Sequence, residues 1–270
     1  MIASVDPGTG EWSSCVDVVV RLRAAGCVFA EDEASLLVEA AAGDACVLER
    51  LVASRVAGEP LEQLLGWVAF GGRQVVVGPG VFVPRVRTEL LAEQALAELA
   101  AGDVVVELCC GVAAVAAVLQ SNGRVSELYV ADIDPVAVGY ARRNVVEPGV
   151  VLVGDLYQPL PTELRGRVDL IVANAPYVPT DAIALMPREA RDHEPLIALD
   201  GGADGVDVQR RIIAEAPGWL RAGGSLLIEA GRAQSAITAA EMRSAGLSVT
   251  VVADDDRDAT VVVGTRPPDQ

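Results

Sequence analysis

The sequence predicts an α/β fold, in which a doubly wound, mostly parallel seven-stranded sheet follows a small helical domain. Apolar residues recur at helical spacing from the start of the chain to about Gly66. From Gly102 onward, apolar segments typical of strands alternate with segments typical of helices. Alternation of this kind buries a parallel sheet between two helical layers. Only the acidic run Asp254-Asp255-Asp256 separates the last two strands, which leaves no room for a crossover helix. We therefore expect these two strands to pair antiparallel.

Residues 1–68 are assigned to the helical domain. Ser14 is expected to begin a helix that ends at Gly26, and a second helix is expected over 31–42. Asp44 is expected to cap a third helix, whose apolar residues are Val47, Leu48, Leu51 and Val52. Both a stabilising role and the docking of a partner fit such a bundle.

Residues 69–85 are expected to form a β-hairpin that links the two domains. Valine-rich segments at 75–77 and 81–83 lie on either side of Gly78-Pro79-Gly80. Glycine and proline between two apolar runs are typical of a turn.

The α/β domain is expected to span 86–270 and to begin with a helix over 89–100, capped by Thr88. Strands are expected at 104–108, 128–131, 150–153, 168–173, 225–229, 249–252 and 260–263. Further helices are expected at 113–120, 135–144, 205–220 and 233–245.

Charge and composition exclude several classes of protein. The 270 residues carry a formal net charge of −17, whereas binding to nucleic acid depends on Lys and Arg. A large duplex footprint is therefore not expected, although a local basic patch stays open. The first residues lack the basic and apolar segments of a signal peptide, and the longest apolar stretch, 108–119, is too short to cross a bilayer. We expect a cytoplasmic protein with no membrane partner.

Five cysteines lie in apolar segments: Cys15, Cys27, Cys46, Cys109 and Cys110. No pair has a metal-ligand spacing with histidines nearby, because the chain contains one histidine. No metal site is predicted. The odd number of cysteines and their apolar surroundings favour reduced, buried thiols.

The loop after the first strand of the sheet offers the first candidate contacts for a cofactor, Glu107, Cys109, Gly111 and Ala113. Such a loop lets backbone N–H groups approach a ligand, and glycine normally permits this. Only Gly111 remains of a glycine-rich pattern, so an ordinary tight turn fits the loop equally well. Small side chains at 109 and 113 keep close approach possible, but a left-handed backbone at Cys109 would carry strain.

Acidic residues follow the next two strands. Asp132 ends the second strand, where nucleotide-binding sheets place an acceptor for ribose hydroxyls. Asp134 suits the cap of the next helix, which leaves Asp132 for a ligand. Asp155, followed by Leu156, is placed to meet an adenine amino group, and a plain turn role fits it almost as well.

Asn174-Ala175-Pro176-Tyr177 follows the buried fourth strand. The carboxyl end of a strand is where open α/β sheets bind ligands. The side-chain carbonyl of Asn174 and the main-chain carbonyl of Ala175 offer two acceptors, which suit the two donors of a planar –NH2 group. Tyr177 would pack on the face of that group. The segment therefore predicts chemistry on an amide or amino nitrogen.

These four strand ends together resemble the S-adenosylmethionine-dependent methyltransferase fold. More narrowly, the chain resembles the protein-(glutamine-N5) methyltransferase family, which modifies peptide-chain release factors. The resemblance covers nearly the whole chain, and its most specific part is the loop from His193 to Gly205. Its other motifs are 55–61, 79–85, 89–91 and 154–156.

The resemblance implies a Rossmann-like methyltransferase domain, a monomer, S-adenosylmethionine as cofactor and a release factor as protein substrate. It implies catalysis by Asn174, Ala175, Pro176 and Tyr177. It implies cofactor contacts from Glu107, Cys109, Gly111, Ala113, Asp132, Asp155, Leu156 and Asn174.

Two departures from the family pattern matter for the expected activity. Ala175 stands where the family has proline, but alanine keeps the required main-chain carbonyl. Pro176 still biases Ala175 toward an extended backbone, so the loss of preorganisation is roughly 0.4–1 kcal/mol. The glycine-poor loop bears on cofactor affinity more than on the chemistry.

Four functions are compatible with parts of the sequence. A glutamine methyltransferase is favoured over a nucleic-acid adenine-N6 methyltransferase, which would need a basic surface and an extruded base. A non-catalytic family member and a nicotinamide dehydrogenase fit less well, because neither explains the segment 174–177. His193 invites a role as base, but a structural role in its loop is the better interpretation.

Overall fold

The computed structural model describes residues 15–268 and divides the chain into two compact units, with the boundary between Gly66 and Trp67. Each unit encloses an apolar core of its own. The predicted helix start at Ser14 lies outside the described residues.

The first unit is helical, as the periodicity predicts. Asp44 caps its third helix, because its carboxylate accepts hydrogen bonds from the N–H groups of Cys46 and Val47 at 2.8 and 3.1 Å. This cap confirms the prediction. A short fourth helix was not predicted, since five residues carry little periodicity. The helices are α1 (Cys15–Ala24), α2 (Ala30–Ala41), α3 (Ala45–Ala57) and α4 (Leu61–Leu65).

The second unit begins with a two-stranded hairpin of β1 (Trp67–Phe70) and β2 (Arg73–Val76). Its turn is Gly71-Gly72, with φ of 55° and 73°. Two consecutive left-handed residues give a tight turn whose twist matches that of paired strands. The hairpin predicted around Gly78-Pro79-Gly80 is therefore wrong in position, and residues 81–83 form no strand.

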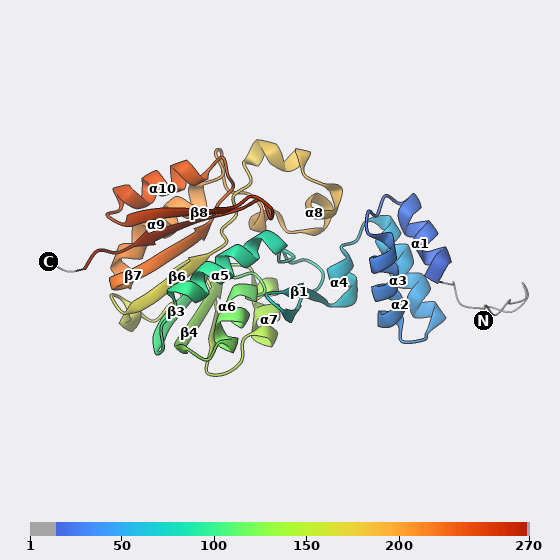
Figure 1. Ribbon diagram of the computed structural model, residues 1–270, viewed down its shortest axis with the longest axis horizontal. Coiled ribbons are helices and arrows are strands. Elements are labelled where there is room, and N and C mark those ends of the chain that lie inside the picture. The colour runs from blue at the N-terminus through green and yellow to red at the C-terminus, as the bar shows by residue number, and fades with distance from the viewer. Residues whose placement is uncertain (1–14, 269–270) are drawn as a thin grey trace, which may run out of the picture. The chain divides into compact units, whose positions relative to one another are not determined.

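A mostly parallel sheet of seven strands forms the centre of this unit, which confirms the predicted fold class (Figure 1). The strand order is β5-β4-β3-β6-β7-β9-β8, and β9 runs antiparallel to both of its neighbours. The pairing of the last two strands is thus as predicted. The strands are β3 (Asp103–Leu108), β4 (Val125–Asp132), β5 (Val150–Val153), β6 (Val168–Ala173), β7 (Leu220–Glu229), β8 (Ser248–Asp254) and β9 (Ala259–Thr265).

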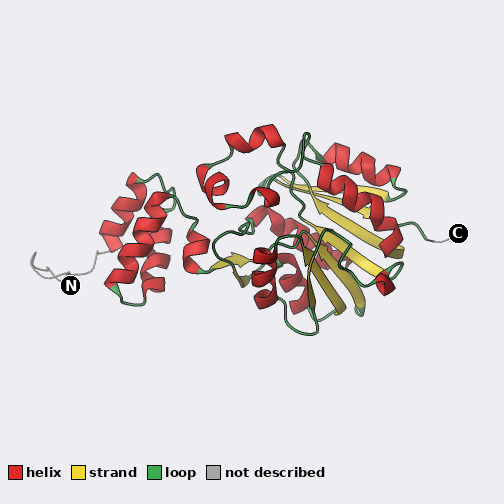
Figure 2. Ribbon diagram, turned by 180° about the vertical axis from the view of Figure 1, so that it is seen from behind, coloured by secondary structure: helices red, strands yellow, loops and turns green. Residues whose placement is uncertain are grey.

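Helices cover both faces of the sheet (Figure 2). One core holds residues of α5 (Glu89–Glu98), α6 (Ala114–Ser121) and α7 (Pro135–Asn144), and the other holds residues of α9 (Asp207–Trp219) and α10 (Ser235–Ser244). Successive side chains of β3 enter opposite cores, because strand residues alternate between faces.

The segment between β6 and α9, which includes the predicted loop from His193 to Gly205, contains three short helical pieces. They are the 3₁₀ turns Thr180–Leu185 and Leu196–Ala198 and, between them, α8 (Arg188–His193). Two further 3₁₀ turns are Val86–Thr88, before α5, and Thr162–Leu164, before β6. Among the described residues, no helix combines the length and apolarity that crossing a bilayer requires.

Asn144, the last residue of α7, holds the hairpin to the loop that follows β3. Its Oδ1 accepts a hydrogen bond from the N–H of Val76 at 2.8 Å, and its Nδ2 donates to the carbonyl of Val76 at 2.9 Å. The same Nδ2 donates to the carbonyl of Val112 at 2.8 Å. One side chain therefore satisfies three backbone groups from two distant segments.

Candidate active site

The carboxyl ends of β3, β4, β5 and β6 meet at one cavity of about 340 Å³. The chain leaves β3 toward β4 on one side and meets β6 on the other, so the cavity lies at a topological switch point. Ten of the predicted site residues line it: Glu107, Cys109, Gly111, Asp132, Asp155, Leu156, Asn174, Ala175, Pro176 and Tyr177. Ala113 is not in its wall, because it is fully buried at the start of α6.

The loop after β3 has a left-handed backbone at three alternate residues. The φ angles are 51° at Cys109, 54° at Gly111 and 61° at Ala113. Only Gly111 adopts this conformation without a Cβ penalty, which for other residues is roughly 1–2 kcal/mol. The strain expected at Cys109 is therefore present, and Ala113 shares it.

The two adjacent thiols of this loop enter opposite cores. Cys109 packs against the core that holds α9 and α10 residues, and Cys110 lies in the other. Burial raises the pKa of both thiols, so both stay protonated and unreactive. The prediction of buried thiols holds for Cys110 and is wrong for Cys15 and Cys46, which are exposed.

Asp132 ties the loop to the end of β4. Its Oδ2 accepts a hydrogen bond from the N–H of Gly111 at 2.8 Å, and its Oδ1 accepts one from the N–H of Asp134 at 2.9 Å. Burial raises the pKa of this carboxyl. Each oxygen keeps a further lone pair for a ligand hydroxyl. Asp134 caps α7 through the N–H of Val136 at 2.8 Å, as predicted.

Asp155 is engaged by a residue that the sequence did not single out. Arg211 of α9 donates to Asp155 Oδ2 at 2.5 Å, and both side chains line the cavity. One oxygen of Asp155 is therefore taken by an arginine, and the other has no side-chain hydrogen bond among the described residues. Leu156 follows with φ of 51°.

Glu107 is a buried carboxyl at the end of β3. Its Oε2 accepts a hydrogen bond at 2.7 Å from the N–H of Ala116, in the first turn of α6. Burial raises the pKa of Glu107 to about 8, so the group is mostly protonated at pH 7. It fastens the strand to the helix across the loop.

Hydrogen bonds to buried polar side chains fix the segment 174–177 in place. Asn174 Nδ2 donates to Thr88 Oγ1 at 3.3 Å, and the Tyr177 hydroxyl donates to Glu229 Oε1 at 3.1 Å. The guanidinium of Arg87 lies over the Tyr177 ring, 5.7 Å from its centroid. The predicted helix cap by Thr88 is wrong, because this residue has a helical backbone and makes no side-chain cap.

Glu229 ends β7 and is almost fully buried. Burial raises the pKa of its carboxyl, while the nearby Thr88 hydroxyl, the charge of Arg87 and the hydrogen bond from Tyr177 act in the opposite direction. Arg87 Nε lies 3.6 Å from Glu229 Oε1. Glu229 Oε2 meets no described residue at ordinary hydrogen-bond geometry. The Thr88 hydroxyl therefore lies close enough to act on this carboxyl without making a hydrogen bond of ordinary geometry to it.

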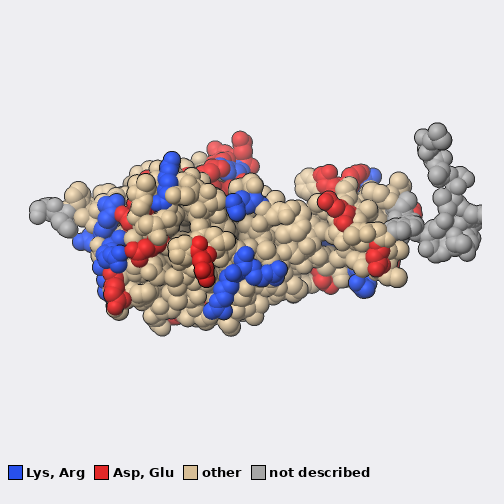
Figure 3. All heavy atoms as spheres, turned by 90° about the horizontal axis from the view of Figure 1, so that it is seen from below, with Lys and Arg blue, Asp and Glu red and all other residues tan. Residues whose placement is uncertain are grey.

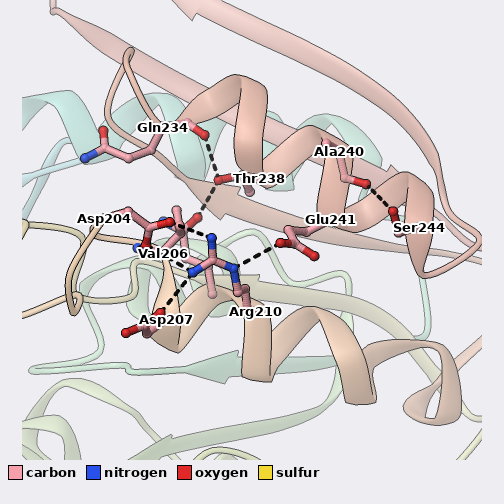
Figure 4. A network of polar contacts seen from close by, with 10 residues as sticks. Asp204, Val206, Asp207, Arg210, Gln234, Thr238, Ala240, Glu241 and Ser244 are labelled. Carbon is pink, nitrogen blue, oxygen red and sulfur yellow. Dashed lines mark hydrogen bonds and ion pairs between the residues drawn. The ribbon is translucent and has the colours of Figure 1, made fainter.

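The glycine-rich loop before α9 buttresses this segment. Val178 pairs with Asp200, whose Oδ1 accepts hydrogen bonds from the Thr180 hydroxyl at 2.7 Å and from the N–H of Gly202 at 2.9 Å. Arg210 then anchors the far end of the loop, because it pairs with three carboxylates (Figure 4). These are Asp204 at 2.6 Å, Asp207 at 2.9 Å and Glu241 at 3.0 Å.

His193 and Glu194 have different places in the structure. His193 ends α8 and does not line the cavity, which agrees with a structural role. Glu194 is buried, and its Oε1 accepts hydrogen bonds from the N–H of Val83 at 3.2 Å and from Arg85 Nη2 at 2.5 Å. This carboxyl joins the loop around α8 to the segment that precedes α5. Burial raises its pKa.

Lys and Arg side chains do not form one continuous patch on the face of the molecule shown in Figure 3. Arginines lie in short groups among carboxylates there, and many of the described arginines pair with Asp or Glu. This distribution does not resemble the continuous basic surface that follows a phosphate backbone.

The sequence of this chain is similar to those of known methyltransferases. The family described as methyltransferase small domain matches residues 73–188. The release factor glutamine methyltransferase of Mycolicibacterium smegmatis is 44% identical over 184 residues, which are 67% of this chain and 65% of that protein. The protein of the same name from Geobacter sulfurreducens is 35% identical over 219 residues, which are 80% of this chain and 76% of that protein.

Solved structures agree on the fold. The ribosomal protein L11 methylase of Lactobacillus delbrueckii subsp. bulgaricus has a TM-score of 0.53 at 14% identity, over 72% of this chain and 85% of that one. A likeness at this identity shows the methyltransferase fold alone.

Proposed function

The chain belongs to the release factor glutamine methyltransferase family, and we propose that it methylates the side-chain amide nitrogen of a glutamine in a peptide chain release factor. The segment 174–177 carries this proposal. Asn174 and Ala175 line the cavity together at the carboxyl end of β6, where two carbonyl oxygens can accept the two hydrogens of one amide.

The residues of the cavity fit S-adenosylmethionine. Asp132 keeps lone pairs for ribose hydroxyls, and Asp155 keeps one oxygen that could accept a hydrogen bond from an adenine amino group. The left-handed residues of the loop after β3 bring its backbone close to the cavity. When bound, S-adenosylmethionine supplies a methyl group on a positively charged sulfur, which is the electrophile of the reaction.

An amide nitrogen is a weak nucleophile, because its lone pair is delocalised into the carbonyl. Asn174 and the carbonyl of Ala175 would hold both of its hydrogens, which fixes the nitrogen and raises its electron density. Orientation supplies most of the rate acceleration, and the two oxygens stabilise the positive charge that grows on nitrogen. Tyr177 would close one side of the amide, and its own position is set by Glu229 and Arg87.

The first unit is proposed to dock the release factor. Four of its apolar side chains are largely exposed, Val16, Val20, Val28 and Phe29, with exposed fractions between 62% and 82%. Exposed apolar side chains on a small helical unit favour contact with a partner. We propose that the enzyme acts as a monomer in the cytoplasm, where peptide chain release takes place.

Transfer of labelled methyl from S-adenosylmethionine tests this function. The full chain is incubated with a purified bacterial release factor, and the labelled residue is located by mass spectrometry. Label on one glutamine is expected, and Asn174→Ala should lower turnover by at least about a hundredfold with little change in cofactor affinity. Label transferred to bacterial DNA or RNA in a parallel incubation, and not to the release factor, would instead support an adenine methyltransferase.

A further inference from the structure

The side chain of Asn174 can face the cavity in two ways that differ in chemistry. An asparagine amide presents an acceptor oxygen on one side and an NH2 donor on the other, and the two arrangements have nearly the same shape. Only the oxygen suits a substrate amide. With its NH2 group toward the cavity, Asn174 would suit a carboxylate instead.

Thr88 is the group that distinguishes these arrangements. Its hydroxyl is buried and lies 3.3 Å from Asn174 Nδ2, which donates to it. A hydroxyl has one proton to give, and the nearby Glu229 is a buried carboxyl that, when ionised, can only accept it. A hydroxyl whose proton points toward Glu229 has only lone pairs left for Asn174.

The polar contacts therefore run in one direction, because Asn174 donates to Thr88 and the Thr88 hydroxyl turns its proton toward Glu229. Tyr177 donates to the same carboxyl at 3.1 Å, so Glu229 orders two residues of the segment at once. We propose that Thr88 is a specificity-determining residue: it fixes the amide of Asn174 with its oxygen toward the cavity, so that the site selects glutamine and rejects glutamate. This inference rests on the proposed function of the same site.

Binding without turnover gives the first test. S-adenosylhomocysteine replaces the cofactor, and affinity is measured for a purified bacterial release factor and for the same protein with its methylated glutamine changed to glutamate. Wild type should prefer glutamine by at least about tenfold, the usual effect of one buried polar mismatch. Thr88→Val should reduce this preference to about threefold or less, and Thr88→Ser should keep it.

A matched control separates orientation from packing. Thr238 is another buried threonine, whose hydroxyl donates to Gln209 Oε1 at 2.6 Å on the α9–α10 side of the sheet. Thr238→Val loses a buried hydroxyl of the same kind but should leave the ratio of the two affinities unchanged. An unchanged ratio in Thr88→Val as well would overturn the proposal.

Turnover gives a second test, through Asn174→Asp. A carboxylate presents an oxygen to the cavity whichever way it turns, so it has no orientation to lose. Thr88→Val should therefore lower kcat about tenfold in the wild-type background and less than about threefold in the Asn174→Asp background. Equal losses in the two backgrounds would mean that Thr88 is merely structural.

A third measurement needs no substrate and separates this inference from the proposed function. In ¹⁵N-labelled protein, the side-chain NH2 signal of Asn174 is identified by its loss in Asn174→Asp. Its hydrogens should exchange with water at least about tenfold faster in Thr88→Val than in wild type or Thr88→Ser, because the buried acceptor is gone. Equal exchange would contradict the inference, whereas a wild type that binds no release factor would contradict only the proposed function.

Discussion

The backbone of Gly205 packs directly against the carbonyl oxygen of Tyr177. A Cβ atom at position 205 would lie 2.4 Å from that oxygen, and the φ of Gly205 is +80°. The glycine-rich loop therefore has two reasons to keep glycine at this point. A larger residue at position 205 would therefore push against the main chain of Tyr177 in the segment 174–177.

Gly205→Ala is expected to lower kcat by at least about tenfold, since Tyr177 must move and a small displacement of reacting groups is costly. Steady-state kinetics with a release factor measure this. Gly166→Ala is the matched control, because Gly166 has a φ of +70° but nothing within 4 Å of its Cβ position. It should share the backbone strain, about 1–2 kcal/mol, and keep kcat. Similar kcat values for the two variants would contradict the buttressing role of Gly205.

Asp132→Ala is expected to weaken S-adenosylmethionine binding by about 10- to 100-fold, since it removes a charged acceptor from the cavity and frees the N–H of Gly111. The saturated rate should stay within about threefold of wild type. Calorimetry gives the Kd, and turnover at saturating cofactor gives the rate.

Asp169→Ala controls for the loss of a structural carboxylate. Asp169 also accepts a backbone hydrogen bond, from the N–H of Val104 at 2.8 Å, but it lies near the amino end of β6, away from the cavity. It should lose stability and keep cofactor affinity. If Asp132→Ala binds S-adenosylmethionine with the Kd of wild type, Asp132 does not contact the cofactor.

Glu107 is expected to make stability depend on pH. Its pKa is raised from 4.5 to about 8 in the folded chain, so the folded state keeps a proton that the unfolded chain releases above pH 4.5. The stability that this proton contributes is fully present below about pH 4.5 and is lost as the pH rises through 8.

Urea unfolding of wild type and Glu107→Gln isolates this effect. Glutamine does not ionise, so the difference in free energy of unfolding between the two proteins should change by roughly 3–5 kcal/mol between pH 5 and pH 9, in favour of the variant at high pH. A difference independent of pH would show that Glu107 ionises normally.

Glu194→Ala is expected to destabilise the second unit by about 2 kcal/mol, because the buried N–H of Val83 loses its acceptor. The loss of the ion pair adds less, since a third of the Arg85 side chain is exposed and can be hydrated. Glu194→Gln keeps an acceptor and should recover at least half of the loss. Chemical denaturation measures both, and equal losses would point to the charge rather than the acceptor.

Local patterns predicted the sheet well and the hairpin poorly. The strands β5 and β6 and the helix α7 have the bounds that the sequence predicted, because apolar runs between turn residues and a Pro–Asn pair mark them clearly. The hairpin was misplaced because the valine-rich segment beyond it looked more like strand than Trp67–Phe70 did. The consecutive glycines at 71 and 72 were the stronger turn signal.

The strand-end residues of the site could be predicted because parallel strands bring their carboxyl ends to one edge. Thr88, Arg87 and Glu229 could not be predicted in the same way. Thr88 lies 86 positions from Asn174 along the chain, and Tyr177 lies 52 from Glu229. Their contacts exist only because the sheet order places β7 beside β6 and α5 against both.

Asn144 makes hydrogen bonds to both Val76 and Val112, and these bonds limit where a shortened form of the chain can begin. A fragment that starts at Trp67 retains all three hydrogen bonds of the Asn144 side chain. A fragment that starts at residue 86 lacks the two that are made with Val76. The short hairpin is thus an integral part of the catalytic unit and not a dispensable tether. Any minimal version of this enzyme has to begin upstream of it.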